Sequence, residues 1–93
     1  MENDLNWIPE AVNRLVAMYD KAFGGKPSGR YRIPVKLIRQ IAGKNRLYED
    51  DLRWLSRALL EQGFVLIDMD SFCVVMRANS FVNYRRANED AIS

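Results

Sequence analysis

The sequence predicts one small α+β domain in which three amphipathic helices precede a β-hairpin. Apolar residues recur at helical three-and-four spacing in three separate stretches, and two short β-rich runs flank a tight polar turn near the C-terminus. A chain of 93 residues supplies one hydrophobic core. We therefore expect a single domain over residues 1–93, with its core within 8–77 and an arm or short helix over 78–93.

The first helix is predicted from Ile8 to Phe23. Pro9 suits a first helical turn, and Gly24 is expected to end the helix. The apolar face of this helix comprises Ile8, Val12, Leu15, Val16, Tyr19, Ala22 and Phe23. Residues 24–30, GGKPSGR, then form a basic connector, because three glycines and a proline suit no regular element. This stretch lacks the residue spacing of a phosphate-binding loop.

A short strand and a second helix follow this connector. Residues 31–33 are long enough for one short strand, and Pro34 then opens a helix that ends at Gly43. One face of that helix carries Leu37, Ile38 and Ile41. The strand is the weakest element of a two- or three-stranded antiparallel sheet.

The third helix and the hairpin complete the pattern. The run EDDLRWLSRALLEQG, residues 49–63, has an apolar stripe of leucines, and FVLID (64–68) and FCVVMR (72–77) read as two strands. Residues 88–93 are expected to fray. Trp7 and Trp54 are expected in the core or at its edge, and the rest of the expected core comprises Val12, Leu15, Tyr19, Leu37, Ile38, Ile41, Leu52, Leu55, Leu59, Phe64 and Leu66.

Positive charge is concentrated in the middle of the chain. The net charge is +2, but residues 26–57 carry nine basic side chains against three carboxylates, a balance of +6, and each flanking third has a balance of −2. No acidic residue lies between Lys26 and Glu49. Such a segment favours an anionic partner, nucleic acid above all.

The order helix, strand, helix, turn, helix, hairpin resembles the winged helix-turn-helix superfamily. The local cue is LRWLSRALLEQGFVLI, residues 52–67, an amphipathic helix that passes through a glycine into a strand. The resemblance covers residues 8–77 and identifies no subfamily. It implies duplex DNA binding, with the third helix in the major groove and the hairpin wing against the backbone. Together with the basic segment, it nominates as DNA-binding residues Arg30, Arg32, Lys36, Arg39, Lys44, Arg46, Arg53, Ser56 and Arg57.

Acidic residues depart from this family pattern. Three carboxylates occupy residues 49–51 at the start of the third helix, and the wing turn carries Asp68 and Asp70 and has no lysine or arginine. Carboxylates also stabilise helix N-termini, and Glu49 and Glu61 can pair with the arginines of this helix. Either DNA contact shifts toward the second helix, the turn and the loop before the first strand, or the chain is a protein-interaction adaptor. These two functions are the alternatives.

Catalysis and metal binding have no candidate residues. The chain has no histidine, one cysteine and no nucleophile beside a recognisable base, so we expect no enzyme activity, cofactor or metal site. A single cysteine excludes an intrachain disulfide and favours a reducing compartment. The N-terminus lacks signal-peptide features and no segment is apolar enough for a membrane span, so we expect a cytoplasmic protein.

Both faces of the hairpin are apolar. Alternate residues of a strand point to opposite sides, and one apolar face must cover the helices, so the other needs a cover of its own. That cover is a homodimer partner, the residues before the first helix or a docked C-terminal arm. The predicted dimer or arm interface comprises Val65, Ile67, Cys73, Val75, Phe81, Val82 and Tyr84. Cys73 is also expected to be a buried, unreactive thiol.

Overall fold

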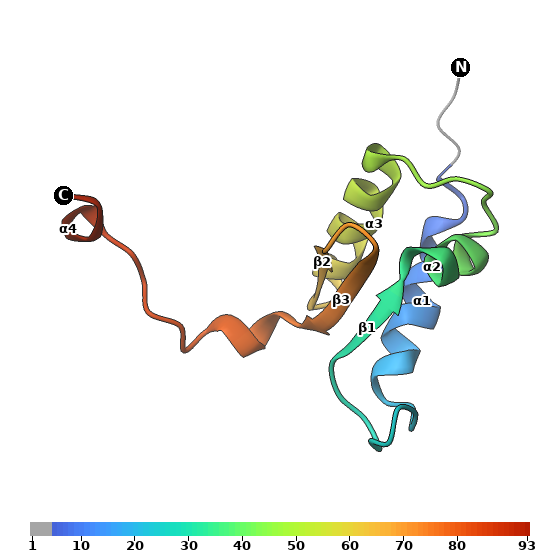
Figure 1. Ribbon diagram of the computed structural model, residues 1–93, viewed down its shortest axis with the longest axis horizontal. Helices are drawn as coiled ribbons and strands as arrows, with labels where there is room; N and C mark the ends of the chain where they lie inside the picture. Colours follow the sequence, from blue (N-terminus) through green and yellow to red (C-terminus); the bar gives the residue numbers. More distant parts are fainter. Residues whose placement is uncertain (1–4) are drawn as a thin grey trace.

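Helices and a small sheet make up the described part of the chain. The structure is a computed structural model that describes residues 5–93 (Figure 1). Its elements are α1 (Ile8–Tyr19), β1 (Tyr31–Pro34), α2 (Val35–Ala42), α3 (Glu49–Glu61), β2 (Phe64–Asp68), β3 (Phe72–Arg77), the 3₁₀ helix η1 (Ala78–Phe81) and α4 (Glu89–Ile92). The predicted α+β class is confirmed, and the domain boundary predicted at residue 1 lies outside the described residues.

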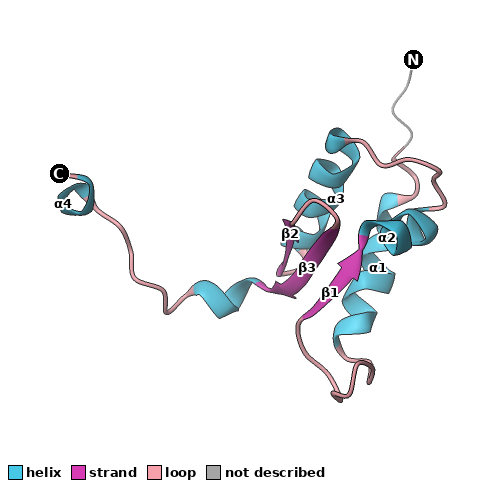
Figure 2. Ribbon diagram, in the orientation of Figure 1, coloured by secondary structure: helices cyan, strands magenta, loops and turns pink. Residues whose placement is uncertain are grey.

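The sheet is antiparallel, with the strand order β1-β3-β2 (Figure 2). The predicted strand before α2 is therefore real, and it pairs with the second strand of the hairpin, Tyr31 opposite Val75. A polar turn joins β2 to β3, in which the Met69 N–H donates to the Phe72 carbonyl at 2.8 Å. Asp70 takes a positive φ of 77° in this turn, and its N–H donates to the Asp68 carboxylate at 2.8 Å.

One face of the sheet and the first three helices enclose the core. The buried cluster comprises Ile8, Ala11, Val12, Leu15, Tyr31, Ile33, Ile38, Leu55, Leu59, Phe64, Leu66, Cys73 and Val75. Seven of the eleven residues expected in the core besides the two tryptophans belong to it, so most of the predicted core is confirmed. Trp54 is 42% exposed, so its expected place in the core or at its edge is wrong. Tyr19, Ile41 and Leu52 are only partly buried against the cluster. Leu37 is 41% exposed, because it faces an open groove beside α2 instead of the core.

The first helix is shorter than predicted. It ends at Tyr19, and Asp20 and Lys21 donate their N–H groups to carbonyls three residues back, which tightens the last turn. The Gly29 N–H donates to the Tyr19 carbonyl at 2.8 Å, so the returning loop satisfies the helix end. Phe23 therefore lies outside the helix, in a turn in which its backbone pairs with Lys26. The helical spacing of Ala22 and Phe23 was misleading, because the glycine-rich turn begins before Gly24.

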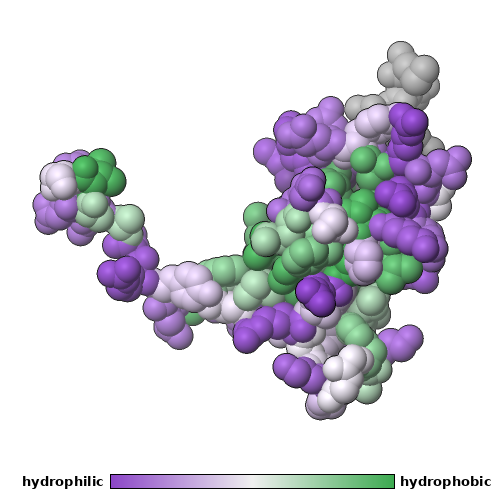
Figure 3. Space-filling model, in the orientation of Figure 1, coloured by the Kyte–Doolittle hydropathy of each residue, from purple (hydrophilic) through white to green (hydrophobic). Residues whose placement is uncertain are grey.

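The predicted outward face of the hairpin is wrong for β3. Cys73 and Val75 are fully buried and lie on the core side, because Val75 pairs with the core residue Leu66. Directly paired residues share one face of a sheet, so the β3 residues opposite Val65 and Ile67 point outward. The other face of the hairpin therefore carries Val65, Ile67, Phe72, Val74 and Met76, of which Met76 is buried and the other four are half-buried. Hydrophobic residues gather over β2 and β3 in Figure 3.

The predicted docked arm is also wrong. Residues 78–93 leave the end of β3 and run away from the body of the domain (Figure 1). Val82 is 75% exposed and Tyr84 is 63% exposed, while Phe81 is half-buried with its ring 5.2 Å from that of Tyr84. Residues 88–93, expected to fray, include the short helix α4, whose start is capped by the Asn88 side chain. The radius of gyration of 15.1 Å exceeds the roughly 12 Å of a compact chain of this length.

Candidate nucleic-acid interface

A basic hollow lies beside α2 and the turn that follows it. It has a volume of about 370 Å³, and Lys36, Arg39 and Lys44 contribute its three cations. We call these three residues the α2 basic hollow. The left-handed Gly43 that ends α2 brings Lys44 back beside the last turn of the helix, where its N–H donates to the Arg39 carbonyl at 3.0 Å. Within residues 5–93 none of these cations forms an ion pair.

The side chain of Lys44 is held in place by an aromatic ring. Its Nζ atom lies 5.4 Å from the centroid of the Trp7 ring, a cation–π distance. Trp7 itself packs against the core cluster, which confirms the expected place of this tryptophan at the core edge. The contact orients the ammonium group without neutralising it, so its charge stays available to an anion.

A second basic hollow lies on the loop between α1 and β1. It has a volume of about 560 Å³, and its cations are Lys21, Lys26, Arg30 and Arg32. We call these four residues the loop basic hollow. Arg30 and Arg32 were nominated from the sequence, whereas Lys21 and Lys26 were missed. The sequence signal for both was their position on either side of the glycine pair, which folds the chain back on itself.

The polar face of α3 is less basic than the sequence suggested. The guanidinium nitrogens of Arg53 lie 3.5 Å from a carboxylate oxygen of Asp50 and 3.9 Å from one of Glu49. The charge of Arg53 is therefore offset by two carboxylates of its own helix. Ser56 lines a hollow of about 210 Å³ together with Glu49 and Asp68. The structure thus places Arg53 and Ser56 among acidic groups and outside both basic hollows.

Arg46 and Arg57 are the remaining nominated residues. Both are exposed, Arg46 in the turn before α3 and Arg57 on α3, and neither lines one of the two basic hollows. Arg57 forms no ion pair with Glu61 in the described residues, so the proposed structural pairing is absent there. The side chain of Arg57 is therefore free to meet a ligand at the polar face of α3.

Two of the acidic residues near α3 have structural roles. The Asp51 carboxylate accepts a hydrogen bond from the Tyr48 N–H at 2.9 Å, which satisfies a backbone group at the start of the helix. Asp68 accepts the N–H of Asp70 and so shapes the hairpin turn. The expected structural explanation for the acidic helix start is confirmed for Asp51.

Two buried groups have altered acidity, and both belong to the core. Burial raises the pKa of Tyr31 well above its usual value, and its hydroxyl donates to the Leu15 carbonyl. Burial, with a smaller contribution from the charge of Asp68, raises the pKa of Cys73 to about 11. A thiol with this pKa is protonated at neutral pH and is a poor nucleophile. Both groups act as packing residues and lie away from the basic hollows.

The described residues contain few features of other kinds of site. Among residues 5–93 no three potential ligands from histidine, cysteine, aspartate and glutamate are grouped closely enough to hold a metal ion. In the same part of the chain no helix has both the length and the apolar character needed to cross a membrane.

Comparisons with protein-family models, with curated proteins and with solved structures found no match to this chain.

Proposed function

We propose that the protein binds duplex DNA, as a small transcriptional regulator or a DNA-associated accessory factor. The observation that carries this proposal is the α2 basic hollow, in which three cations that form no ion pair within residues 5–93 surround one surface depression. Unpaired lysines and arginines release counterions when they meet phosphates, and this release dominates the affinity of non-specific DNA binding. The loop basic hollow supplies four further cations for the same polyanion.

The order of elements supports a winged-helix architecture for this function. A helix, a strand, two helices and a β-hairpin follow one another, and the first strand joins the hairpin in one sheet. Winged helix-turn-helix proteins use this order, with α3 in the position of the recognition helix. The carboxylates around Arg53 and the hairpin turn oppose a docking centred on α3 and the wing. We therefore propose that the DNA backbone lies against α2, the turn after it and the loop before β1.

A salt titration tests this function directly. Binding of fluorescent duplexes of two unrelated sequences, followed by anisotropy, should weaken steeply as salt rises. Arg39→Ala and Arg46→Ala should each weaken binding similarly on both sequences and make the slope of log affinity against log salt shallower by about 1. Absence of binding at low salt would exclude the proposal.

Arg53→Ala is the matched control for this titration. It removes the same charge as Arg39→Ala, but from a side chain that two carboxylates already offset. We expect its affinity and salt slope to stay close to those of the parent protein. If Arg53→Ala weakens binding while Arg39→Ala does not, the DNA lies against α3 and the proposed docking is wrong.

A second candidate function is that of a protein-interaction adaptor. The specific observation is the α3 surface, where Trp54, near the acidic start of the helix, is 42% exposed and Leu60, near its C-terminal end, is 57% exposed. Exposed large apolar residues beside charges are typical of protein-binding surfaces. If the protein does not bind duplex DNA at low salt, the adaptor function is favoured. If it binds and the affinity falls steeply with salt, the DNA-binding function is favoured.

A further inference from the structure

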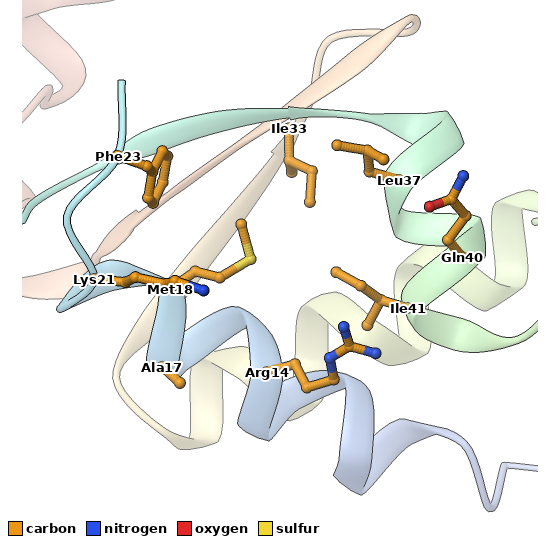
Figure 4. A pocket seen from close by; sticks show the side chains of 9 residues that line it. All are labelled: Arg14, Ala17, Met18, Lys21, Phe23, Ile33, Leu37, Gln40 and Ile41. Carbon is orange, nitrogen blue, oxygen red and sulfur yellow. The ribbon is translucent and has the colours of Figure 1, made fainter. Parts of the chain in front are cut away.

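An open groove lies between α1 and α2, and it adjoins the loop basic hollow, with which it shares Lys21 and Phe23. It has a volume of about 730 Å³. Figure 4 shows apolar side chains around it, from α1, the loop, β1 and α2: Ala17, Met18, Phe23, Ile33, Leu37 and Ile41. Phe23 and Leu37 are each 41% exposed, which makes them two of the large apolar side chains that the domain leaves open to water.

Positive charge borders this apolar groove on the α1 side. Arg14 and Lys21 line it, and within residues 5–93 neither forms an ion pair. Glu10, one helical turn before Arg14 and also described, forms no ion pair with it. Gln40 adds an amide on the α2 side. A ligand that fits this groove combines apolar side chains with carboxylates.

The tip of the C-terminal arm, which follows Arg85 and Arg86, has this complementary chemistry. Its large apolar side chains have no cover on the domain, since Val82, Tyr84 and Ile92 are 75%, 63% and 84% exposed. Glu89 and Ile92 are three residues apart in α4 and so lie on the same face of that helix. One side of the arm tip thus carries a carboxylate and a large apolar side chain together, with Asp90 beside them.

We propose that this groove binds the C-terminal arm of a second copy of the chain, and that two copies exchange arms to form a homodimer. In this assembly Ile92 packs over the apolar floor near Leu37, and the carboxylates of α4 face Arg14 and Lys21. The 15 residues from 78 to 92 reach at most roughly 50 Å when extended, which is enough to cross to a neighbouring copy. Twofold exchange makes both contacts at once, so each strengthens the other.

Reciprocal charge reversal on the full-length chain tests the arm exchange. The parent protein should sediment at tens of micromolar with twice the 10.8 kDa mass of one chain. A groove variant, Arg14→Glu with Lys21→Glu, and an arm variant, Glu89→Lys with Asp90→Lys, should each weaken dimerisation by about a hundredfold or more, because like charges then meet. Mixing the two variants restores both opposite-charge contacts, so the mixture should form dimers again.

Substitutions of single apolar residues supply a second readout. Leu37→Ser in the groove and Ile92→Ser in the arm should each weaken dimerisation by about tenfold or more, because each removes an apolar side chain from the contact. Leu60→Ser on α3 is the matched control, since Leu60 is at least as exposed as Leu37 but lies outside the groove. The control should leave the dimer unchanged.

Three results would each overturn the proposal. A parent protein that sediments as a single chain would show either a free arm or one folded onto its own groove. A dimer that both charge variants preserve would place the interface elsewhere. A dimer that Val74→Asp abolishes while both charge variants retain it would assign the interface to the outward face of the sheet. None of these measurements depends on DNA, so they are independent of the proposed function.

Discussion

The two sides of the turn between α2 and α3 differ in charge although they share one core. On the α2 side, Lys36, Arg39 and Lys44 surround a hollow that no carboxylate of residues 5–93 lines. On the α3 side, Arg53 is offset by two carboxylates of the same helix. Counted along the sequence, both sides belong to the same basic segment, residues 26–57. The contrast teaches that a cation is available to a ligand only where the fold keeps it apart from acidic neighbours.

The largest expected effect tests whether the two sides share a core. Ile38 on α2 and Leu55 on α3 are both fully buried in the same cluster. Ile38→Ala and Leu55→Ala should each lower the free energy of unfolding by about 2–5 kcal/mol, because each leaves a cavity. Urea denaturation measures both losses. A loss below about 1 kcal/mol for either variant would show that its helix is not part of the common core.

The next effect links the acidic hairpin turn to stability at high pH. Burial and the charge of Asp68 raise the pKa of Cys73 to about 11 from 9.0. The unfolded thiol loses its proton first, so stability is complete below pH 9 and falls as the pH rises from 9 to 11. The loss should reach about 2 kcal/mol, from a shift of two pKa units.

Comparison with Cys73→Ala isolates this contribution from other groups that titrate in the same range. The difference in unfolding free energy between the parent and the variant should change with pH between 9 and 11. In Asp68→Asn the pKa of the thiol should be lower, and the dependence should shrink. A difference that stays constant over this range would show that the thiol does not titrate with unfolding.

A smaller effect asks whether the polar face of α3 reads DNA sequence. Arg57 is exposed and free of ion pairs in the described residues. If α3 enters the major groove, Arg57→Ala should reduce discrimination between a preferred and an unrelated duplex by about 1–3 kcal/mol. Arg46→Ala should weaken both duplexes equally. If both variants lose the same binding free energy on both duplexes, α3 contacts only the DNA backbone.

The smallest effect separates the structural role of the acidic residues from their charge. Asp51 accepts the Tyr48 N–H, whereas Asp50 forms an ion pair with the exposed side chain of Arg53. Asp51→Ala should therefore lower the free energy of unfolding by about 1 kcal/mol, and Asp50→Ala by no more than about 0.5 kcal/mol. Both remove one negative charge, so their effects on DNA affinity should match. Equal stability losses would contradict the capping role of Asp51.

Local sequence patterns were sufficient to predict the type and order of most helices and strands. Helical spacing and the terminal glycines placed α2 and α3 within one or two residues of their observed ends, since amphipathic periodicity and glycine in a left-handed conformation are local properties. The end of α1 was missed because the carbonyl of Tyr19 is satisfied by Gly29, ten residues away. No local pattern contains that bond.

The sequence by itself therefore determined where the chain forms helices and strands and which segment carries excess positive charge. Only the tertiary structure decided how these features face one another. Both sides of the hairpin are apolar, so alternation could not show that Cys73 and Val75 face the core; their cross-strand partners decided it. Likewise, the separation of the two basic hollows depends on side chains brought together by folding, whereas the offset of Arg53 arises from residues three and four positions away in the same helix. Burial and electrostatic pairing depend on distances in space. Spacing along the chain fixes such distances only between residues of the same helix or strand.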